Sequence, residues 1–597
     1  MARDVVIGMA GSGGDGIVSA GESLISAAAA VGYHAMMSKS FGPQIRGGES
    51  SCRVRVSTHQ VHGPGDALDL AVALNWDDFL KFGTELACGP ASVVVYDSNT
   101  GIAPADIPLK GARPAQVFAL PLTELTVAAA GTDKAKNSLI LGLLSGWLGI
   151  GRDALLAGMR KRLGKKGPEL LAANQRAFDA GHTCAMENPL IRGMLLEEPN
   201  VKPGSMMLAD GNDMTGAGAV FAGVEFFGGY PITPSTEIMQ FLGREIWKYG
   251  GVVLQAEDEI AGVGAAIGAS FAGKKSMTAT SGPGMALKTE MLGLATIAEI
   301  PLVLVNVQRG GPSTGLPTKT EQSDLFQACF SAHGDVMRPV LAPTSVGDCF
   351  RVTIEAFNIA EKYQTPVIVL SDQDIGHRKE TIAPIDTSLF KVEQRLAPTE
   401  AQLENYARFA QTEDGISPMS KPGTPGGAYL CAGIEHNESG APAANGAVHA
   451  RMNDKRFRKF NSLVGRKDLF EVVGNPDAPL ALIAWGSLAG VCREAQALAV
   501  EEGLHVKLFV PTLLYPINED AYGEFLASVQ AGLVVEQSHQ GQLYRILRMQ
   551  VDVPRGLKSL ARDGANPIHS RDIVARLREL SANLHAPSST TAQGISA

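Results

Sequence analysis

The chain has 597 residues, of which 45% are hydrophobic and 19% charged, with 67 glycines and a formal net charge of −9. This length allows about three to five domains. The composition is typical of an α/β protein whose glycine turns lie close to ligands. The acidic balance argues against nucleic acid as a partner. The most apolar run, residues 139–150, is too short to span a membrane.

The seven cysteines are dispersed along the sequence. No two are close enough to form a CxxC pair, so the sequence predicts neither a structural zinc site nor an iron–sulfur cluster in this chain. An odd number of cysteines without a signal peptide indicates a reducing, cytoplasmic location.

The first segment begins with an apolar strand at residues 5–10, a loop of sequence GSGGDG at residues 11–16 and a helix through residues 19–31. This spacing fits a dinucleotide fingerprint, in which glycine amides approach a phosphate. The acidic residue that would hold a ribose about 20 positions later is missing. The loop is therefore more consistent with another phosphate-bearing ligand than with NAD, and a purely structural turn stays open.

A second loop, SFGPQIRGGE at residues 40–49, precedes an alternating strand at residues 51–56. Arg46 lies between glycines, where it could reach an anion, although an exposed turn arginine is the more common case. A boundary near residues 196–210 breaks the periodicity, and a glycine- and alanine-rich helix is expected at residues 214–227.

Beyond this boundary, short apolar strands recur about every 25 residues with helices between them, which predicts βαβ units and a parallel sheet. These strands are expected before Tyr230 and at residues 251–255, 276–280, 300–307, 339–341 and 366–370. Four of them end in loops rich in Gly, Pro or polar residues. Because the carboxyl ends of parallel strands share one edge, the four loops should converge on one site.

The loop YPITP at residues 230–234 carries two prolines, which bias the residues before them toward extended backbone. Pro234 suits the first turn of a helix, so Thr233 is the predicted N-cap. A hydroxyl beside free helix N–H groups is a ready place for a carboxylate. The alternative is a well-capped helix with no further role.

Residues 385–470 are rich in Pro, Gly and Asn, which predicts an extended connection with a hairpin at residues 426–432. A last α/β domain starts at residue 480, and the Ser-, Thr- and Ala-rich tail from about Ser581 is expected to be disordered.

Together these pieces resemble the 2-oxoacid:ferredoxin oxidoreductases, which are thiamine diphosphate enzymes, and in particular an α subunit with the γ domain fused in front of it. The γ-like motifs are the loops at 11–16 and 40–48. The α-like motifs are YPITP, the segment starting EDE at 257, SGPG at 281 and RGGPSTG at 309, followed by TEDGISP at 412, LYPI at 514 and VEQ at 535. YPITP and RGGPSTG are the most specific of these.

The resemblance implies a multidomain α/β fold with a transketolase-like pyrimidine-binding domain between two further α/β domains. The expected division is 1–195 for the γ-type domain, 205–382 for the pyrimidine-binding domain, 383–472 for the connection, 473–582 for the transketolase C-terminal-like domain and 583–597 for the tail.

The cofactor must lose a ring proton to become a nucleophile, and a carboxylate hydrogen-bonded to its aminopyrimidine assists this loss. By its place in the motif, Glu259 is the residue that the resemblance puts in this role, although an ordinary acid in the first turn of a helix is the plainer interpretation. Further expected cofactor contacts are Tyr230, Pro231, Ser281 and Gly282.

The substrate carboxylate is expected to meet the Thr233 hydroxyl and the planar donor fork of Arg309. Lys319 is a further cation on the same loop and would meet a second carboxylate in a diacid. In the family the γ domain helps to hold coenzyme A, and the expected contacts here are Gly11, Ser12, Gly13, Gly14, Asp15 and Arg46.

The sequence contains no convincing motif for the metal that binds the cofactor's diphosphate, so no metal ligand is assigned. The resemblance implies a β subunit that carries the diphosphate, Mg²⁺ and the iron–sulfur cluster, ferredoxin as acceptor and an (αβ)₂ heterotetramer. We expect 2-oxoglutarate as substrate, with pyruvate or a branched-chain 2-oxoacid as the alternative. A nicotinamide-dependent dehydrogenase and a catalytically silent scaffold subunit are the other classes considered.

Overall fold

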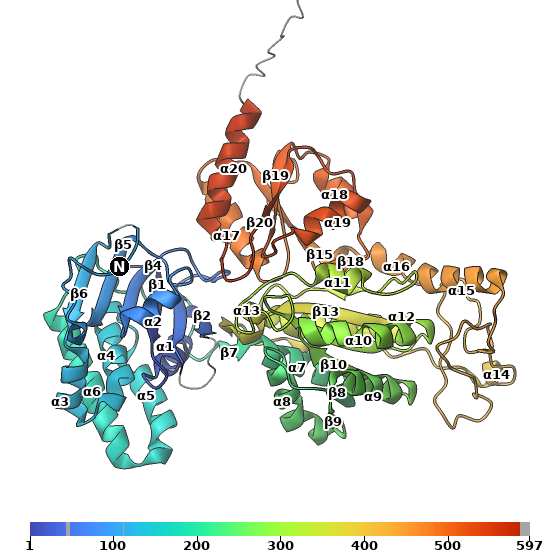
Figure 1. Cartoon of the computed structure of the whole chain (residues 1–597), viewed down its shortest axis with the longest axis horizontal. Coiled ribbons are helices and arrows are strands. Elements are labelled where there is room, and N and C mark those ends of the chain that lie inside the picture. Colours follow the sequence, from blue (N-terminus) through green and yellow to red (C-terminus); the bar gives the residue numbers. More distant parts are fainter. Residues whose placement is uncertain (43–47, 112, 586–597) are drawn as a thin grey trace, which may run out of the picture.

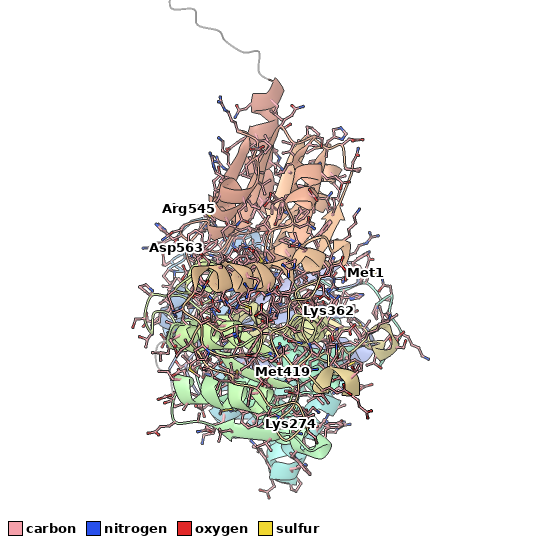
Figure 2. The ribbon with its side chains drawn as sticks, turned by 90° about the vertical axis from the view of Figure 1, so that its right-hand side faces the viewer. Met1, Lys274, Lys362, Met419, Arg545 and Asp563 are labelled. Atoms are coloured by element: carbon pink, nitrogen blue, oxygen red, sulfur yellow. The ribbon has the colours of Figure 1, made fainter. Side chains whose placement is uncertain are left out.

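A computed structural model describes residues 1–42, 48–111 and 113–585. The described chain forms three α/β units, each built around one sheet. The three sheets have eight, seven and five strands. In Figure 1 the N-terminal unit lies on the left, the central unit on the right and the C-terminal unit above. Figure 2, turned by 90°, places Arg545 and Asp563 of the C-terminal unit above Met419 and Lys274. The predicted multidomain α/β fold is confirmed.

The N-terminal unit is organised around β1, which is buried along its whole length after Asp4 because its side chains are apolar. The sheet order is β6-β5-β4-β1-β3-β2-β14-β7, so β7 and β14, which flank the central unit in sequence, extend this sheet. The elements are β1 (Asp4–Gly11), α1 (Ile17–Val31), β2 (His34–Phe41), β3 (Ser50–Ser57), β4 (Leu68–Ala73), α2 (Trp76–Lys81), β5 (Cys88–Asp97), β6 (Gln116–Leu120), α3 (Leu122–Ala130), α4 (Lys136–Leu148), α5 (Arg152–Leu163), α6 (Pro168–Glu187), β7 (Met207–Asp210) and β14 (Lys379–Ile382).

The central unit has the expected parallel sheet, in the order β18-β12-β13-β11-β10-β8-β9, with only β18 antiparallel to its neighbour. Its elements are α7 (Gly211–Phe221), β8 (Phe226–Gly229), α8 (Thr236–Glu245), β9 (Val252–Gln255), α9 (Glu259–Phe271), β10 (Ser276–Thr280), α10 (Gly282–Ile297), β11 (Leu302–Gln308), α11 (Leu325–Phe330), β12 (Val340–Leu341), α12 (Val346–Tyr363), β13 (Pro366–Asp372) and α13 (Gln373–His377).

The connection after β14 contains α14 (Glu400–Leu403), α15 (Gly446–Arg458) and α16 (Asn461–Val464). Lys455 and Lys459 attach this connection to the central unit. Both form ion pairs with the buried carboxylate of Glu299, with Nζ–O distances of 2.7 and 3.2 Å. The hairpin expected at 426–432 is wrong, because these residues, all of them described, form turns and irregular backbone without a strand.

The C-terminal unit contains β15 (Phe470–Val473), β16 (Leu480–Ala484), α17 (Leu488–Glu501), β17 (Val506–Pro511), β18 (Leu513–Tyr515), α18 (Glu519–Leu526), β19 (Ala531–Glu536), α19 (Gln542–Gln550), β20 (Leu557–Ala561) and α20 (Ser570–His585). Because α20 reaches His585, residues 581–585 are helical and do not belong to a disordered tail. Residues 586–597 lie outside the described ranges. Across those ranges, none of the helices combines the length and apolar character needed to cross a bilayer.

Candidate active site

The predicted convergence of loops is confirmed by the pairing of the central strands. β8, β10 and β11 lie side by side and run parallel, so the segments that follow Gly229, Thr280 and Gln308 emerge at one edge of the sheet. The first residue of α9 lies at this same edge.

Glu259 begins α9, next to Asp258, which caps the helix by accepting a hydrogen bond from the Ala261 amide at 2.7 Å. The Glu259 side chain is buried against α10, since a Cβ on Gly284 would lie 3.0 Å from its Oε1. Glu257 and Asp258 are exposed, as expected of ordinary acids at a helix start. Of these three successive acids, Glu259 is thus the one whose side chain is buried.

Lys288 lies behind Glu259 and was not predicted. It is fully buried on α10, and its Nζ donates to the Glu259 carbonyl at 2.9 Å and to Thr278 Oγ1 at 3.2 Å. Burial lowers the pKa of Lys288 to about 8, against the opposing charge of Glu259. This ammonium fixes the backbone from which the Glu259 side chain projects.

Arg309 and Thr233 are brought together. Arg309 is 6% exposed, and its Nη1 donates to the Thr233 carbonyl at 2.6 Å. Its Nε lacks a hydrogen-bond partner among the residues described. Burial lowers the pKa of Arg309, and the charge of Asp324 opposes this effect. A ligand can therefore accept a hydrogen bond from the Arg309 Nε.

The predicted N-cap at Thr233 is wrong. α8 starts at Thr236 with Ser235 as the N-cap residue, and the Ser235 amide donates to the Ile232 carbonyl in a turn that precedes the helix. The Thr233–Pro234 peptide is cis. It is the Thr233 carbonyl, rather than its hydroxyl, that contacts Arg309.

The remaining predicted cofactor contacts lie at the same sheet edge as Glu259. Ser281 is the N-cap residue of α10 and is fully buried, yet its Oγ has no hydrogen-bond partner in the described part of the chain. Gly282 follows it, while Tyr230 and Pro231 directly follow β8. Tyr230 is 41% exposed at the end of that strand.

The Lys319 side chain has other partners than Arg309 and Thr233, although the Lys319 carbonyl accepts a hydrogen bond from the Gly310 amide. Its Nζ donates to Ser40 Oγ at 2.7 Å, forms an ion pair with Glu85 and lies 5.1 Å from the centre of the Phe82 ring. It lines a cavity of about 160 Å³ at the junction of the three units, which Lys39, Arg53 and His569 also line. Arg309 and Lys319, the two cations of this loop, therefore contact different partners.

In the glycine loop of the N-terminal unit, Asp15 Oδ2 accepts a hydrogen bond from the Ser12 amide at 2.9 Å, and the Ser12 hydroxyl donates to Asp78 at 2.6 Å. Two carboxylates thus take up donors that a phosphate would need. Gly14 has a φ of +116° and open space around it. The coenzyme A contacts assigned to this loop stay a prediction, and Arg46 lies outside the described residues.

Comparison with known proteins identifies the family. Residues 217–455 match the model described as "Pyruvate flavodoxin/ferredoxin oxidoreductase, thiamine diP-bdg", and residues 6–184 match "Pyruvate ferredoxin/flavodoxin oxidoreductase". The chain is 34% identical to 2-oxoglutarate oxidoreductase subunit KorA of Mycobacterium tuberculosis, over 92% of this chain and 87% of that protein. It is 28% identical to 2-oxoacid:ferredoxin oxidoreductase 2, subunit alpha, of Aeropyrum pernix, over 97% of this chain and 98% of the relative.

A solved structure agrees with these relatives. The 2-oxoglutarate:ferredoxin oxidoreductase of Magnetococcus marinus, solved with 2-oxoglutarate, coenzyme A and succinyl-CoA bound, is 39% identical with a TM-score of 0.91. The match covers 97% of this chain and 100% of that one. The resemblance inferred from the sequence motifs is thereby confirmed, and the chain belongs to the 2-oxoacid:ferredoxin oxidoreductase family.

Proposed function

We propose that this chain is the fused γ–α subunit of a 2-oxoglutarate:ferredoxin oxidoreductase. The reaction converts 2-oxoglutarate and coenzyme A to succinyl-CoA and carbon dioxide while it reduces ferredoxin. The observation that carries the proposal is the Arg309–Thr233 contact at the same sheet edge as buried Glu259, in a chain that matches the 2-oxoglutarate-binding structure over nearly its whole length. The free cysteines are consistent with a cytoplasmic enzyme.

The residues at the sheet edge fit the aminopyrimidine end of thiamine diphosphate. Glu259 offers a buried carboxylate, and Ser281 offers a buried hydroxyl without a partner in the described chain. When bound, thiamine diphosphate supplies the nucleophile that attacks the substrate ketone. In this arrangement Glu259 accepts the hydrogen bond that orients the cofactor and holds the proton exchanged with it. The other residues proposed to line the cofactor site are Ser281, Gly282, Tyr230 and Pro231.

Arg309 is the proposed anchor of the carboxylate next to the ketone. Its guanidinium is held at Nη1 by the Thr233 carbonyl, which leaves the rest of the donor fork for a ligand. Charge-assisted hydrogen bonds from a buried guanidinium fix both the position and the orientation of a carboxylate. The Thr233 hydroxyl, on the separate loop that follows β8, is a second proposed donor.

Lys319 is the proposed partner of the second carboxylate of a diacid, which would share its ammonium with Glu85. Lys319→Ala should reduce kcat/KM for 2-oxoglutarate about tenfold more than for pyruvate, because only the diacid loses a charge-assisted hydrogen bond. Steady-state kinetics with both acids measure the difference. Lys81→Ala is the matched control, since Lys81 pairs with Glu49 and Asp78 and does not line the cavity. An equal loss for both acids would remove Lys319 from substrate recognition.

A β subunit is the proposed source of the Mg²⁺ that binds the cofactor's diphosphate and of the iron–sulfur cluster. The support is an apolar surface beside Glu259, which we call the edge patch. It comprises the residue that follows β8, the edge strand β9, η4 (Ile246–Tyr249) and the first two turns of α9 and α10. Its exposed members are Tyr230, Trp247, Tyr249, Val252, Leu254, Ile260 and Leu287. An exposed apolar edge strand is a template for association.

Trp247 is 66% exposed in this patch, and buried tryptophans dominate many interfaces. Trp247→Ala should weaken binding of the β subunit by about 2 kcal/mol or more, roughly 30-fold. Binding is measured with purified subunits by calorimetry. Met549→Ala, an equally exposed apolar residue of the C-terminal unit, should change nothing. Unchanged binding by the Trp247 variant would place the interface elsewhere.

The direct test of the proposed function uses the complex co-purified with its β subunit. It is assayed with a panel of 2-oxoacids, coenzyme A and a viologen dye. We expect a brown complex with the highest kcat/KM for 2-oxoglutarate, and a colourless, inactive chain when it is expressed alone. A higher kcat/KM for pyruvate or a branched-chain acid would overturn the choice of substrate.

A further inference from the structure

The loop that begins with Arg309 is held mainly at its base. The Gly310 amide donates a hydrogen bond to the Lys319 carbonyl at 3.0 Å, and the Leu316 amide donates to the Gly310 carbonyl at 2.8 Å. Between these contacts, residues 311–316 are exposed. The position of the Arg309 side chain therefore depends on what fixes the backbone at the base of this loop.

Glu321 is a buried carboxylate at this base, and no role has been assigned to it above. It is 8% exposed, and its Oε2 accepts a hydrogen bond from the Gly311 amide at 3.3 Å. A Cβ on Gly310 would lie 3.2 Å from the same oxygen, so the carboxylate packs directly against the backbone that follows Arg309. Burial raises the pKa of Glu321, and hydrogen bonds from the Gly564 and Gly311 amides oppose this effect.

Gly564 belongs to the C-terminal unit, in the loop that follows β20. A Cβ on Gly564 would lie 3.1 Å from Glu321 Oε2 and 3.0 Å from the Thr320 carbonyl oxygen, so this loop fits closely against the segment that carries Glu321. The Gln537 side chain holds the loop in place. Its Nε2 donates to three carbonyls of the loop, those of Arg562, Asp563 and Asn566, at 3.1, 2.7 and 2.9 Å.

Gln322 joins the same segment to the C-terminal unit a second time. Its amide donates to the Gln537 carbonyl at 2.7 Å, and its side-chain oxygen accepts from the Gln537 amide at 2.9 Å. Its Nε2 donates to the Trp485 carbonyl at 2.8 Å. Gln537 is the last residue of the VEQ motif, which the functional site described above does not use. This motif therefore links the C-terminal unit to the base of the Arg309 loop.

We propose that Glu321 is a positioning residue for 2-oxoacid binding, which holds the backbone that follows Arg309 and is itself held by the C-terminal unit. This inference rests on the proposed role of Arg309 as the anchor of the substrate carboxylate. A carboxylate that accepts hydrogen bonds from two backbone amides fixes both segments relative to each other. A guanidinium fork binds a carboxylate in one orientation only if it is placed to within a fraction of an ångström, so a displaced loop binds the substrate less tightly.

Glu321→Ala in the complex with the β subunit removes the acceptor of both amides. KM should rise about tenfold for 2-oxoglutarate and for pyruvate alike, because both acids need Arg309, while kcat stays within about twofold of wild type. Steady-state kinetics measure both values. Glu321→Gln keeps a side-chain oxygen that can accept these hydrogen bonds, so it should restore most of the lost affinity. A merely structural role would instead lower kcat through the fraction of folded enzyme and leave KM unchanged.

Gly564→Ala tests the contribution of the C-terminal unit. Its new Cβ would press on the Thr320 carbonyl and on Glu321, so KM for both acids should rise about threefold or more, although Gly564 does not carry a side chain toward the substrate. Gly523→Ala is the matched control. It lies in α18 of the same unit, where a Cβ would meet nothing within 4 Å, and it should leave KM unchanged.

Two further measurements show whether Glu321 acts through Arg309. The affinity for 2-hydroxyglutarate, which has both carboxylates but no ketone, is measured by calorimetry without turnover. Glu321→Ala should weaken this affinity by the same factor by which it raises KM. In the Arg309→Lys background, Glu321→Ala should add little to the rise in KM, because the fork that Glu321 positions is already lost.

Each outcome decides the proposal. An unchanged KM and an unchanged affinity for 2-hydroxyglutarate in Glu321→Ala would overturn the positioning role while the proposed function stood, and so would fully additive effects of the Glu321 and Arg309 substitutions. If Glu321→Ala did not fold, Gly564→Ala would decide, and an unchanged KM in that variant would overturn the role. A wild-type complex that did not oxidise 2-oxoglutarate would instead overturn the proposed function.

Discussion

Glu259→Gln should lower the turnover of the complete complex by about two to four orders of magnitude, the usual contribution of a positioned acid–base group. Glutamine keeps the shape that packs against Gly284, so the fold of the site should persist. The variant loses the negative charge that the proposed cofactor contact requires and cannot exchange a proton. Single-turnover kinetics on the cofactor-loaded complex measure the effect.

The matched control for this experiment is Glu257→Gln, which removes the same charge from an exposed residue two positions earlier. It should leave turnover within about twofold of wild type, since an exposed acid near a helix start contributes mainly about 0.3–1 kcal/mol of helix stability. Thermal unfolding of both variants separates this stability effect from catalysis. If Glu259→Gln kept more than a tenth of wild-type turnover, Glu259 would be only a helix-end acid.

The central fold could be predicted because its signals are local. The strand expected at 276–280 coincides with β10, and the one expected at 366–370 lies within β13. Short apolar runs bounded by glycine and polar residues contain the information that sets these elements. Their parallel pairing followed from the regular spacing, and with it the sheet edge at which Glu259 and Arg309 both lie.

The details that depend on distant contacts could not be predicted. β14 pairs with β2 through Lys379–Met37 and Glu380–Met36, and no local pattern shows that the N-terminal sheet continues into the central unit. The helix expected at 214–227 ends at Phe221, because the aromatic residues that follow pair as β8. Short apolar runs do not distinguish the end of a helix from the start of a buried strand.

The same limit applies to the site. Thr233 was predicted as a helix cap because Pro234 after it suits the first turn of a helix, but its contact with Arg309 joins residues on separate loops. Lys288 is one cation in the middle of a helix, and Asp324 is one acid before another helix. Only the folded chain shows that the first holds the Glu259 backbone and that the second faces Asn306.

Arg309→Lys should reduce kcat/KM for every 2-oxoacid by about 10- to 100-fold, although the charge is retained. A lysine ammonium is a point charge without the planar fork, so it cannot hold both the Thr233 carbonyl and a carboxylate in fixed geometry. The loss corresponds to roughly 1.5–3 kcal/mol for a hydrogen bond to a charged group. Because each 2-oxoacid has the carboxylate next to the ketone, pyruvate and 2-oxoglutarate should be affected equally.

Thr233→Val distinguishes the role of the Thr233 hydroxyl from that of the Thr233 backbone carbonyl. Valine removes the hydroxyl but keeps the backbone carbonyl that binds Arg309, and Thr233 does not occupy the N-cap position of α8, which begins at Thr236. The variant should therefore unfold at nearly the wild-type temperature, while its kcat/KM reports the hydroxyl alone. If Thr233→Val lost as much activity as Arg309→Lys, the hydroxyl would be the main anchor of the carboxylate. If Arg309→Lys instead affected only the diacid, Arg309 would face the distal carboxylate, and the orientation of the substrate proposed here would have to be reversed.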